Sequence, residues 1–297
     1  MGQHLGTRAT LSPAVQTAEQ REEAGVEAFK KLQADDEVNR RLFEEQIEII
    51  KKAWTQDSIE HNSALWQIPY PYDTGTEWPM YSTADLGAPG EMEDRKHVRK
   101  VSVVPSPYTK PHPPVFVASS ASPRTVEYCA QQGFIPTYFA GIRGAAALGS
   151  KYVDWAKEAG RDYALGQNQA LVRWIQIGKD AEDARRKVRL YDAEIQKHFY
   201  SQTAYFAHDK GSVEHYTWDD WVDATINTGL WVTGSLEDVK RNYIEQWKQL
   251  TSEYAVLICH YAQQPVESVL ENLSQFMEHI KPELDAMTTY AQEPVAV

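Results

Sequence analysis

The sequence predicts an α/β fold with a parallel sheet, and two observations carry this prediction. The first is a strand–helix–strand unit over residues 113–139, which contains its own start and stop signals. The second is a series of short apolar runs, rich in β-branched and aromatic residues, that alternate with stretches of helical periodicity. Strands that alternate with helices form parallel sheets, because each helix returns the chain to the edge where it started. The predicted strands cover residues 115–118, 134–139, 170–177 and 254–260.

The helix of the unit at residues 113–139 has clear end signals. Ser122 occupies an N-cap position and is followed by Pro123 at the first helical position, where a missing N–H costs little. Gly133 is expected to end the helix in a left-handed conformation. Apolar residues at i, i+3 and i+4 predict one buried stripe, formed by Val126, Cys129 and Ala130.

The loop between the first strand and this helix is a candidate anion site. The free N–H groups and the positive dipole end at a helix N-terminus attract anions. Three hydroxyls and one cation are available to complete such a site, from Ser119, Ser120, Ser122 and Arg124. In the alternative interpretation, Ser122 only caps the helix and the other two serines face solvent.

Residues 101–139 resemble the middle of bacterial luciferase-like flavin monooxygenases, above all in the run Lys110-Pro111-His112-Pro113-Pro114 and in the loop that follows the strand. In that family a proline-rich stretch leads into the fifth strand of a (β/α)8 barrel, and the loop after that strand holds the flavin phosphate. The resemblance therefore implies an FMN phosphate site at Ala118, Ser119, Ser120 and Ser122. Some relatives have a hydroxyl residue at the position of Pro123. Proline has no hydroxyl, so no phosphate contact is expected from this position.

The resemblance covers residues 39–284 and implies a TIM-barrel type fold. The four predicted strands align with strands five to eight, so only the second half of a barrel, about four βα units, is expected. We expect residues 1–38 to form a loose or helical arm and residues 285–297 a loose tail. Helices are predicted at 22–32, 36–54, 145–159, 181–199 and 267–280, and long irregular, aromatic-rich insertions at 60–112 and 206–228.

By resemblance the chain is an enzyme that oxidises a small organic substrate with O2 and reduced FMN, in some cases supplied by a flavin reductase. The catalytic histidine of the family comes from the early strands, so no catalytic residue is assigned. The carboxyl ends of barrel strands line the site, which makes Tyr138, Phe139 and His260 candidate substrate-pocket residues. Two alternatives stay open: a deazaflavin (F420)-dependent oxidoreductase of the same fold, and a non-catalytic pairing subunit.

Composition narrows the range of partners. The net charge of −12 disfavours nucleic acid and anionic membranes as partners.

The sequence shows no signal peptide and no long apolar segment, which predicts a cytoplasmic protein. Cys129 and Cys259 read as small core residues, and His208 and His215 lack a third ligand, so no metal site is expected. A half-barrel would leave two open strand edges, which predicts a homo-oligomer or pairing with another barrel chain.

Overall fold

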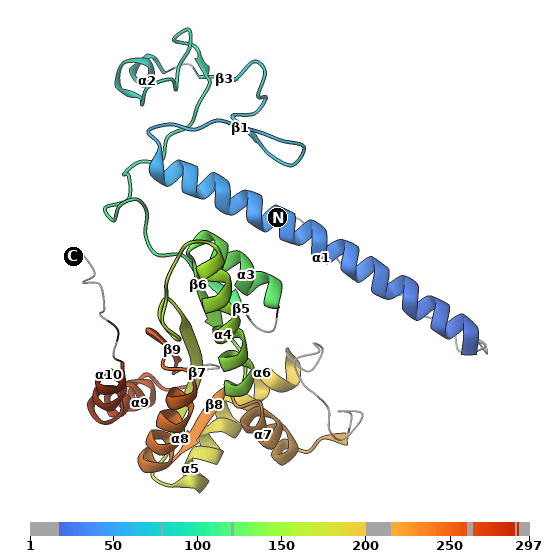
Figure 1. Ribbon diagram of the computed structural model, residues 1–297, viewed down its shortest axis with the longest axis vertical. Coiled ribbons are helices and arrows are strands. Elements are labelled where there is room, and N and C mark those ends of the chain that lie inside the picture. Colours follow the sequence, from blue (N-terminus) through green and yellow to red (C-terminus); the bar gives the residue numbers. More distant parts are fainter. Residues whose placement is uncertain are drawn as a thin grey trace. The chain divides into compact units, whose positions relative to one another are not determined.

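The computed structural model describes residues 18–78, 80–119, 122–199, 215–259, 264–288 and 290 (Figure 1). The chain divides into two compact units, Met1–Pro113 and Pro114–Val297, which we describe separately. All five strands of the parallel sheet lie in the second unit.

The first described element of the first unit is one long helix, α1 (Ala18–Thr55), of 38 residues. The sequence predicts two helices here, 22–32 and 36–54, and this separation is wrong. The residues between them, 33–35, include neither glycine nor proline, so nothing in the sequence breaks the hydrogen-bond ladder.

Short paired segments follow α1, within the region predicted as an irregular insertion. The carboxylate of Glu91 accepts hydrogen bonds from the backbone N–H groups of Ala88, at 2.7 Å, and Ser102, at 2.9 Å. The insertion is therefore ordered by side-chain contacts to its own backbone. Its elements are the antiparallel pairs β1 (His61–Asn62) with β2 (Gln67–Ile68) and β3 (Thr76–Glu77) with β4 (His97–Val98), and the helix α2 (Tyr81–Leu86).

The second unit is built on a five-stranded parallel sheet, as the sequence predicts for its fold class. The strand β7 lies at its centre: β6 pairs with its first two residues, β8 with its last four, and β9 with residues 170–174. Among the described residues the sheet does not close into a barrel. The strands are β5 (Phe116–Ser119), β6 (Ile135–Tyr138), β7 (Ala170–Ile177), β8 (Trp231–Gly234) and β9 (Tyr254–Ile258).

The sequence predicts four of these strands, so the expected number is one too low. The missed strand, β8, has only four residues and ends at Gly234. Glycine is disfavoured in strands, so the run Trp231–Gly234 carries only a weak strand signal.

Helices connect the strands, and their ends follow the predicted signals in α3. Ser122 Oγ accepts the N–H of Thr125, and Gly133 has a φ of 75°. The helices are α3 (Pro123–Gln132), α4 (Ile142–Glu158), α5 (Ala181–Lys187), a π-helical turn η1 (Val188–Asp192), α6 (Ala193–His198), α7 (Trp218–Asn227), α8 (Leu236–Gln249), α9 (Val266–His279) and α10 (Lys281–Met287).

Two of these helices differ from the prediction. Residues 218–227 form α7 inside the segment predicted to be irregular, and a capping box between Thr217 and Asp220 starts this helix. The signal was present in the sequence as Thr-x-x-Asp. The helix α10 extends to Met287, beyond the expected start of the loose tail at residue 285.

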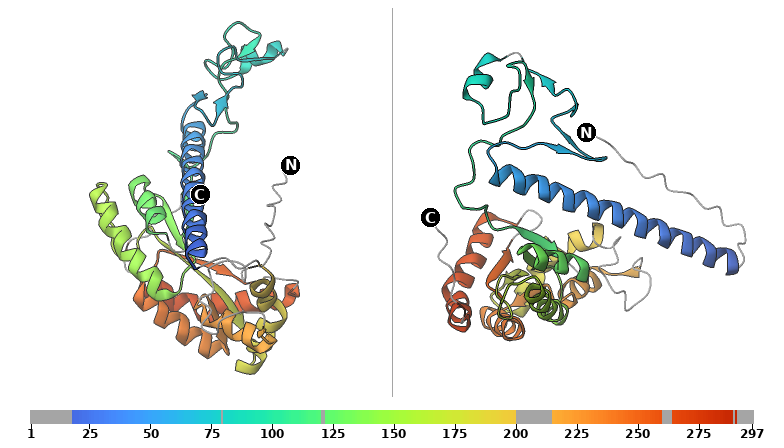
Figure 2. Two further views of the ribbon diagram at one scale, coloured as in Figure 1. Left: turned by 90° about the vertical axis from the view of Figure 1, so that its right-hand side faces the viewer. Right: turned by 45° about the horizontal axis from the view of Figure 1, so that its top comes forward.

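The sheet has two faces of different character. Residues that are partners in a parallel pair share a face, and successive residues alternate between faces. We call the face that carries Phe116, Ala118, Thr137, Val172, Trp174 and Trp231 the inner face. We call the opposite face, with Val117, Ser119, Tyr138 and Arg173, the helix face, because α3, α4 and α8 cover it (Figure 2).

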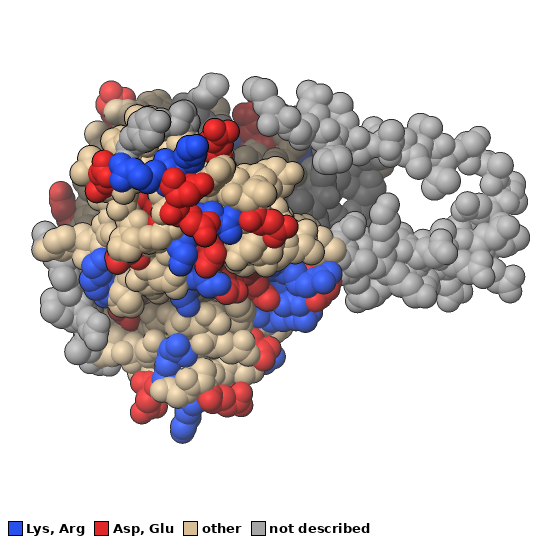
Figure 3. Space-filling model, turned by 90° about the horizontal axis from the view of Figure 1, so that it is seen from above, with Lys and Arg blue, Asp and Glu red and all other residues tan. Residues whose placement is uncertain are grey.

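The surface carries charges of both signs. On the face seen in Figure 3, acidic and basic side chains are interspersed, without a broad patch of either sign.

Candidate functional site

The candidate site lies along the edge where the parallel strands end. All pairings within the sheet are parallel, so the five carboxyl ends point to the same edge. In barrel-type α/β proteins the loops at this edge form the active site.

At the end of β5 the two described serines of the predicted phosphate loop differ. Ser119 is buried on the helix face, and its hydroxyl donates to the carbonyl of Val117 at 3.2 Å. Ser122 is exposed, and its Oγ accepts the Thr125 N–H at 3.4 Å. Because Ser122 uses only an acceptor position, its hydroxyl hydrogen can still be donated to a ligand oxygen.

The first turn of α3 also suits an anion electrostatically. It contains no acidic residue, whereas α7 and α8 carry acidic residues in theirs that already balance the positive end of the helix dipole. Ser122 and the N-terminus of α3 therefore fit a phosphate group, and Ser119 contributes mainly to the packing of the strand end. Ala118 lies exposed on the inner face beside them.

The predicted pocket residues are placed on opposite faces of the sheet. Tyr138 is fully buried on the helix face and its hydroxyl donates to Gln169 Oε1 at 2.9 Å, so it is a core residue. Phe139 follows β6, is half-buried, and donates its N–H to the carbonyl of Ser119 at 2.9 Å. This bond joins Phe139 to the β5 strand end. Ser120, His260 and His208 lie outside the described residues.

An aromatic cluster fills the inner face next to Phe139. The rings of Trp174 and Trp231 stack with their centroids 4.4 Å apart, and Phe139 meets Trp174 edge-on at 6.1 Å. Apolar residues of β7 and β9 pack against these rings, among them Val172, Val256 and Ile258. These residues give the inner face an apolar wall beside the β6 strand end.

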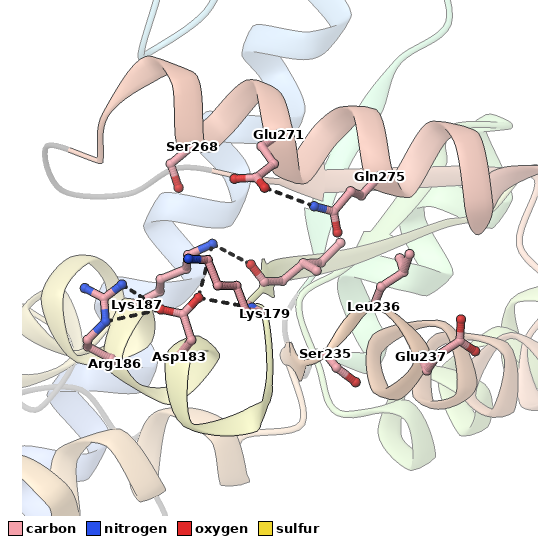
Figure 4. A pocket seen from close by; sticks show the side chains of 12 residues that line it. Lys179, Asp183, Arg186, Lys187, Ser235, Leu236, Glu237, Ser268, Glu271 and Gln275 are labelled. Carbon is pink, nitrogen blue, oxygen red and sulfur yellow. Dashed lines mark hydrogen bonds and ion pairs between the residues drawn. The ribbon is translucent and has the colours of Figure 1, made fainter.

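A pocket of about 510 Å3 opens at the ends of β7 and β8 (Figure 4). Its size lies within the range of small-molecule sites. The lining comes from the end of β7, from α5, from the β8–α8 turn and from α9: Ile177, Gly178, Lys179, Asp183, Arg186, Lys187, Ser235, Leu236, Glu237, Ser268, Glu271 and Gln275.

The charges of this pocket balance, with three cations and three carboxylates among the lining residues. Asp183 bonds to Arg186 at 2.6 Å and accepts the backbone N–H of Lys179 at 3.1 Å. Those contacts hold the pKa of Asp183 below its usual value, with Arg186 as the largest cause. Lys187 donates to the carbonyl of Ile177 at 2.7 Å. The pocket is therefore polar without a strong net field.

Side chains complete the polar pairing at the end of β7. Asn272 of α9 accepts the N–H of Ile177 at 2.8 Å and donates to Gln176 Oε1 at 3.2 Å. Gln176 also donates to Gln264 at 2.8 Å. All three amides are buried, so they fix α9 to the strand end through bonds that water cannot replace.

Replacing Asn272 with alanine is expected to lower the free energy of unfolding by about 2 kcal/mol, because it leaves a buried N–H and a buried amide oxygen with one partner fewer. The measurement is a urea titration. Ser274→Ala, at an exposed position of the same helix, is the matched control and should change little. Equal losses in the two variants would mean that the Asn272 bonds contribute nothing beyond the helix itself.

A buried carboxyl lies close to the tryptophan cluster. Asp192, in η1, is 1% exposed, and its Oδ2 has no hydrogen-bond partner. Burial raises the pKa of Asp192 to about 7, and the nearby Trp231 indole and Gln176 amide offset only part of this rise. Single π-type turns inside helices are rare and occur often at functional sites.

Sequence reasoning missed both the pocket and Asp192. One signal was available: Ala184, Val188, Asp192 and Gln196 follow each other at i+4, and all four are buried. A carboxylate in the buried stripe of a helix indicates a perturbed group. The pocket had no such signal, because its residues come from four separate elements.

The described part of the chain shows no group of three or more potential metal ligands. Within the same residues, no helix has the length and apolar character needed to cross a membrane.

A parallel sheet with helices on one face and candidate sites at its carboxyl edge is the arrangement of barrel-type α/β proteins. The family model of the luciferase-like monooxygenases matches residues 15–252. The chain belongs to the luciferase-like monooxygenase family, which confirms the resemblance stated above.

Solved structures agree on the fold. The chain is similar to the monooxygenase RslO1 from Streptomyces bottropensis, with 15% identity and a TM-score of 0.58, over 82% of this chain and 61% of that one. It is also similar to the oxygenating constituent of 3,6-diketocamphane monooxygenase from Pseudomonas putida, a type II Baeyer-Villiger monooxygenase solved with FMN. Here the identity is 16% and the TM-score 0.56, over 81% and 62% of the two chains. This chain thus spans about three fifths of either structure. Among curated proteins, no sequence matches it.

Proposed function

We propose that this protein binds FMN at the carboxyl edge of its sheet and acts in the flavin-dependent oxidation of a small organic substrate by O2. The observation that carries the proposal is the family match over residues 15–252, to which the N-terminus of α3 adds a fitting phosphate site. Reduced FMN, when bound, supplies the electrons for the reaction with O2.

The described residues would have three tasks in this function. Ser122 donates its hydroxyl hydrogen to the phosphate, at a helix terminus free of acidic residues. Phe139 and the stacked Trp174 and Trp231 shield the inner face from water. The pocket of Figure 4 is polar and charge-balanced, so it suits a polar part of the substrate better than a phosphate. No described residue is assigned the role of catalytic base.

The test is a titration of the purified chain with FMN, followed by flavin fluorescence and by thermal unfolding. We expect saturable quenching and a raised melting temperature in the wild type. Ser122→Ala should weaken binding about tenfold, because it removes a hydrogen bond to a charged group.

Ser235→Ala is the matched control, since Ser235 is also an N-cap serine but begins α8. Both variants lose a cap, and only Ser122→Ala should lose affinity. Weaker binding in Ser235→Ala alone would move the phosphate to the pocket of Figure 4. If the folded wild type binds F420 and not FMN, F420 takes the place of FMN in this proposal. If it binds neither cofactor, the result favours a non-catalytic pairing subunit.

A further inference from the structure

The pocket at the ends of β7 and β8 distributes its charges unevenly, although their sum is zero. One wall, formed by the end of β7 and by α5, carries all three cations of the lining (Figure 4). The opposite wall belongs to α9 and presents Ser268, Glu271 and Gln275. These three residues follow each other at intervals of three and four, so they share one side of the helix. The pocket is therefore dipolar.

On the cationic wall, one ammonium group is available to a ligand. Arg186 bonds to Asp183 at 2.6 Å, and Lys187 donates to the carbonyl of Ile177 at 2.7 Å. The ammonium group of Lys179 forms no hydrogen bond or ion pair with any described residue. A ligand carboxylate can therefore pair with Lys179 without breaking an existing contact.

The α9 wall presents two acceptors side by side. The amide nitrogen of Gln275 donates to the Glu271 carboxylate at 3.4 Å, so the amide oxygen of Gln275 is left for another donor. Within the described part of the chain, Glu271 forms no ion pair with any cation. A carboxylate next to an amide oxygen suits an ammonium group, which has three hydrogens to donate.

Ser268 connects the α9 wall to the buried amides at the end of β7. Its hydroxyl oxygen accepts from Gln264 at 3.0 Å, and Gln264 is itself buried and bonded to Gln176 at 2.8 Å. The hydroxyl hydrogen of Ser268 remains available to a ligand oxygen. Ile177 and Leu236 add apolar surface to the lining.

We propose that this pocket binds a small zwitterion of the amino-acid type, with an ammonium group and a carboxylate on one carbon atom. Lys179 and the Ser268 hydroxyl hold the carboxylate, and Glu271 and the Gln275 amide oxygen hold the ammonium group. A simple anion leaves Glu271 without a partner and a simple cation leaves Lys179 without one, so a ligand with both charges fits best. The inference rests on the proposed function for the role of the pocket, which there receives a polar part of the substrate.

A calorimetric titration of the flavin-free chain with L-leucine tests the proposal. Two analogues isolate the charges: 4-methylpentanoate lacks the ammonium group, and 3-methylbutylamine lacks the carboxylate. Leucine should bind at least about tenfold more tightly than either analogue, because each of them loses one charge-assisted pair. Since no FMN is present, this result is independent of the FMN titration, and either proposal can fail alone.

The variants Lys179→Gln and Glu271→Gln test the two walls separately. Each should weaken leucine binding about tenfold. Glu271→Gln should also remove most of the preference for leucine over 4-methylpentanoate, and Lys179→Gln most of the preference over 3-methylbutylamine. A general distortion of the pocket would weaken all three ligands alike. Lys248→Gln and Glu278→Gln, at exposed positions outside the pocket lining, are the matched controls and should bind leucine as the wild type does.

Three results would overturn the proposal. The first is a folded wild type that binds neither leucine nor glycine, which carries the same two charges without a side chain. The second is an analogue that binds as tightly as leucine, since the site would then recognise a single charge. The third is unchanged leucine binding in both variants. Thermal unfolding shows that the variants are folded, because substitutions at exposed positions should leave the melting temperature nearly unchanged.

Discussion

Replacing Asp192 with asparagine is expected to stabilise the protein at neutral pH by up to about 4 kcal/mol. Asp192 is almost fully buried in η1, and burial raises its pKa from 3.8 to about 7. This difference in pKa corresponds to about 4 kcal/mol between the two protonation states. Asparagine keeps the size of the side chain and cannot ionise.

The pH dependence follows from the direction of this increase. Between pH 4 and 7 the folded protein binds a proton at Asp192 that the unfolded chain has released. The free energy of unfolding therefore falls as the pH rises through this window, with the full loss above pH 7. The gain from Asp192→Asn should be near zero at pH 4, rise across the window, and level off above pH 7.

Urea titrations of wild type and variant at several pH values measure this difference. Because both proteins share all other titrating groups, the subtraction isolates Asp192. A difference independent of pH would mean that Asp192 is solvated or paired in solution, and would remove the reason to regard it as a perturbed group.

Asp94→Asn provides a control of opposite sign. The side chain of Asp94 accepts from His97 and from the backbone N–H groups of His97 and Lys96, and these contacts lower its pKa to about 2. The stability that Asp94 contributes is present above pH 4 and is lost as the pH falls toward 2. This variant should therefore have a lower free energy of unfolding than the wild type at neutral pH, and the difference should shrink as the pH falls.

The elements that could be predicted from the sequence are those whose signals come from neighbouring residues in the chain. Local signals were sufficient for α3, because Ser122, Pro123 and Gly133 act on the backbone within a few residues. The strand β7 was predicted with its observed bounds, Ala170–Ile177, because six of its eight residues are apolar and leave a long signal. Both cases depend on neighbours in the chain.

The features that escaped prediction depend on contacts between distant segments. The strand β8 is short and gains its place by pairing with β7. Tyr138 follows Thr137 by one residue, and only the pairing register places it on the helix face instead of the inner face. In the sequence, α9 has the apolar spacing of an ordinary core helix, with Leu270, Leu273 and Met277 on one side. The structure buries Asn272 and Phe276 instead and leaves these three side chains exposed.

The loop before β7 holds a second position with a large expected effect. Gly166 has a φ of 91°, and a Cβ there would lie 1.7 Å from the carbonyl oxygen of Thr251. The obstacle is backbone, so it cannot rotate away. The loop also joins the starts of two strands, because Gly166 accepts the N–H of Glu253 at 2.9 Å and Gln169 accepts that of Tyr254 at 3.1 Å.

Gly166→Ala is therefore expected to lower the free energy of unfolding by about 4 kcal/mol, from the left-handed backbone and the steric overlap together. Gly160→Ala separates the two causes. Gly160 has a φ of 82°, and a Cβ there would meet nothing within 4 Å. It should cost only about 1 kcal/mol, from the backbone alone. If the two variants unfold at the same urea concentration, the close approach to Thr251 does not exist in solution. If Gly166→Ala unfolds at a much lower urea concentration than Gly160→Ala, the close approach to Thr251 holds β9 against β7. It then also sets the spacing of Val256 and Ile258 from the tryptophan cluster.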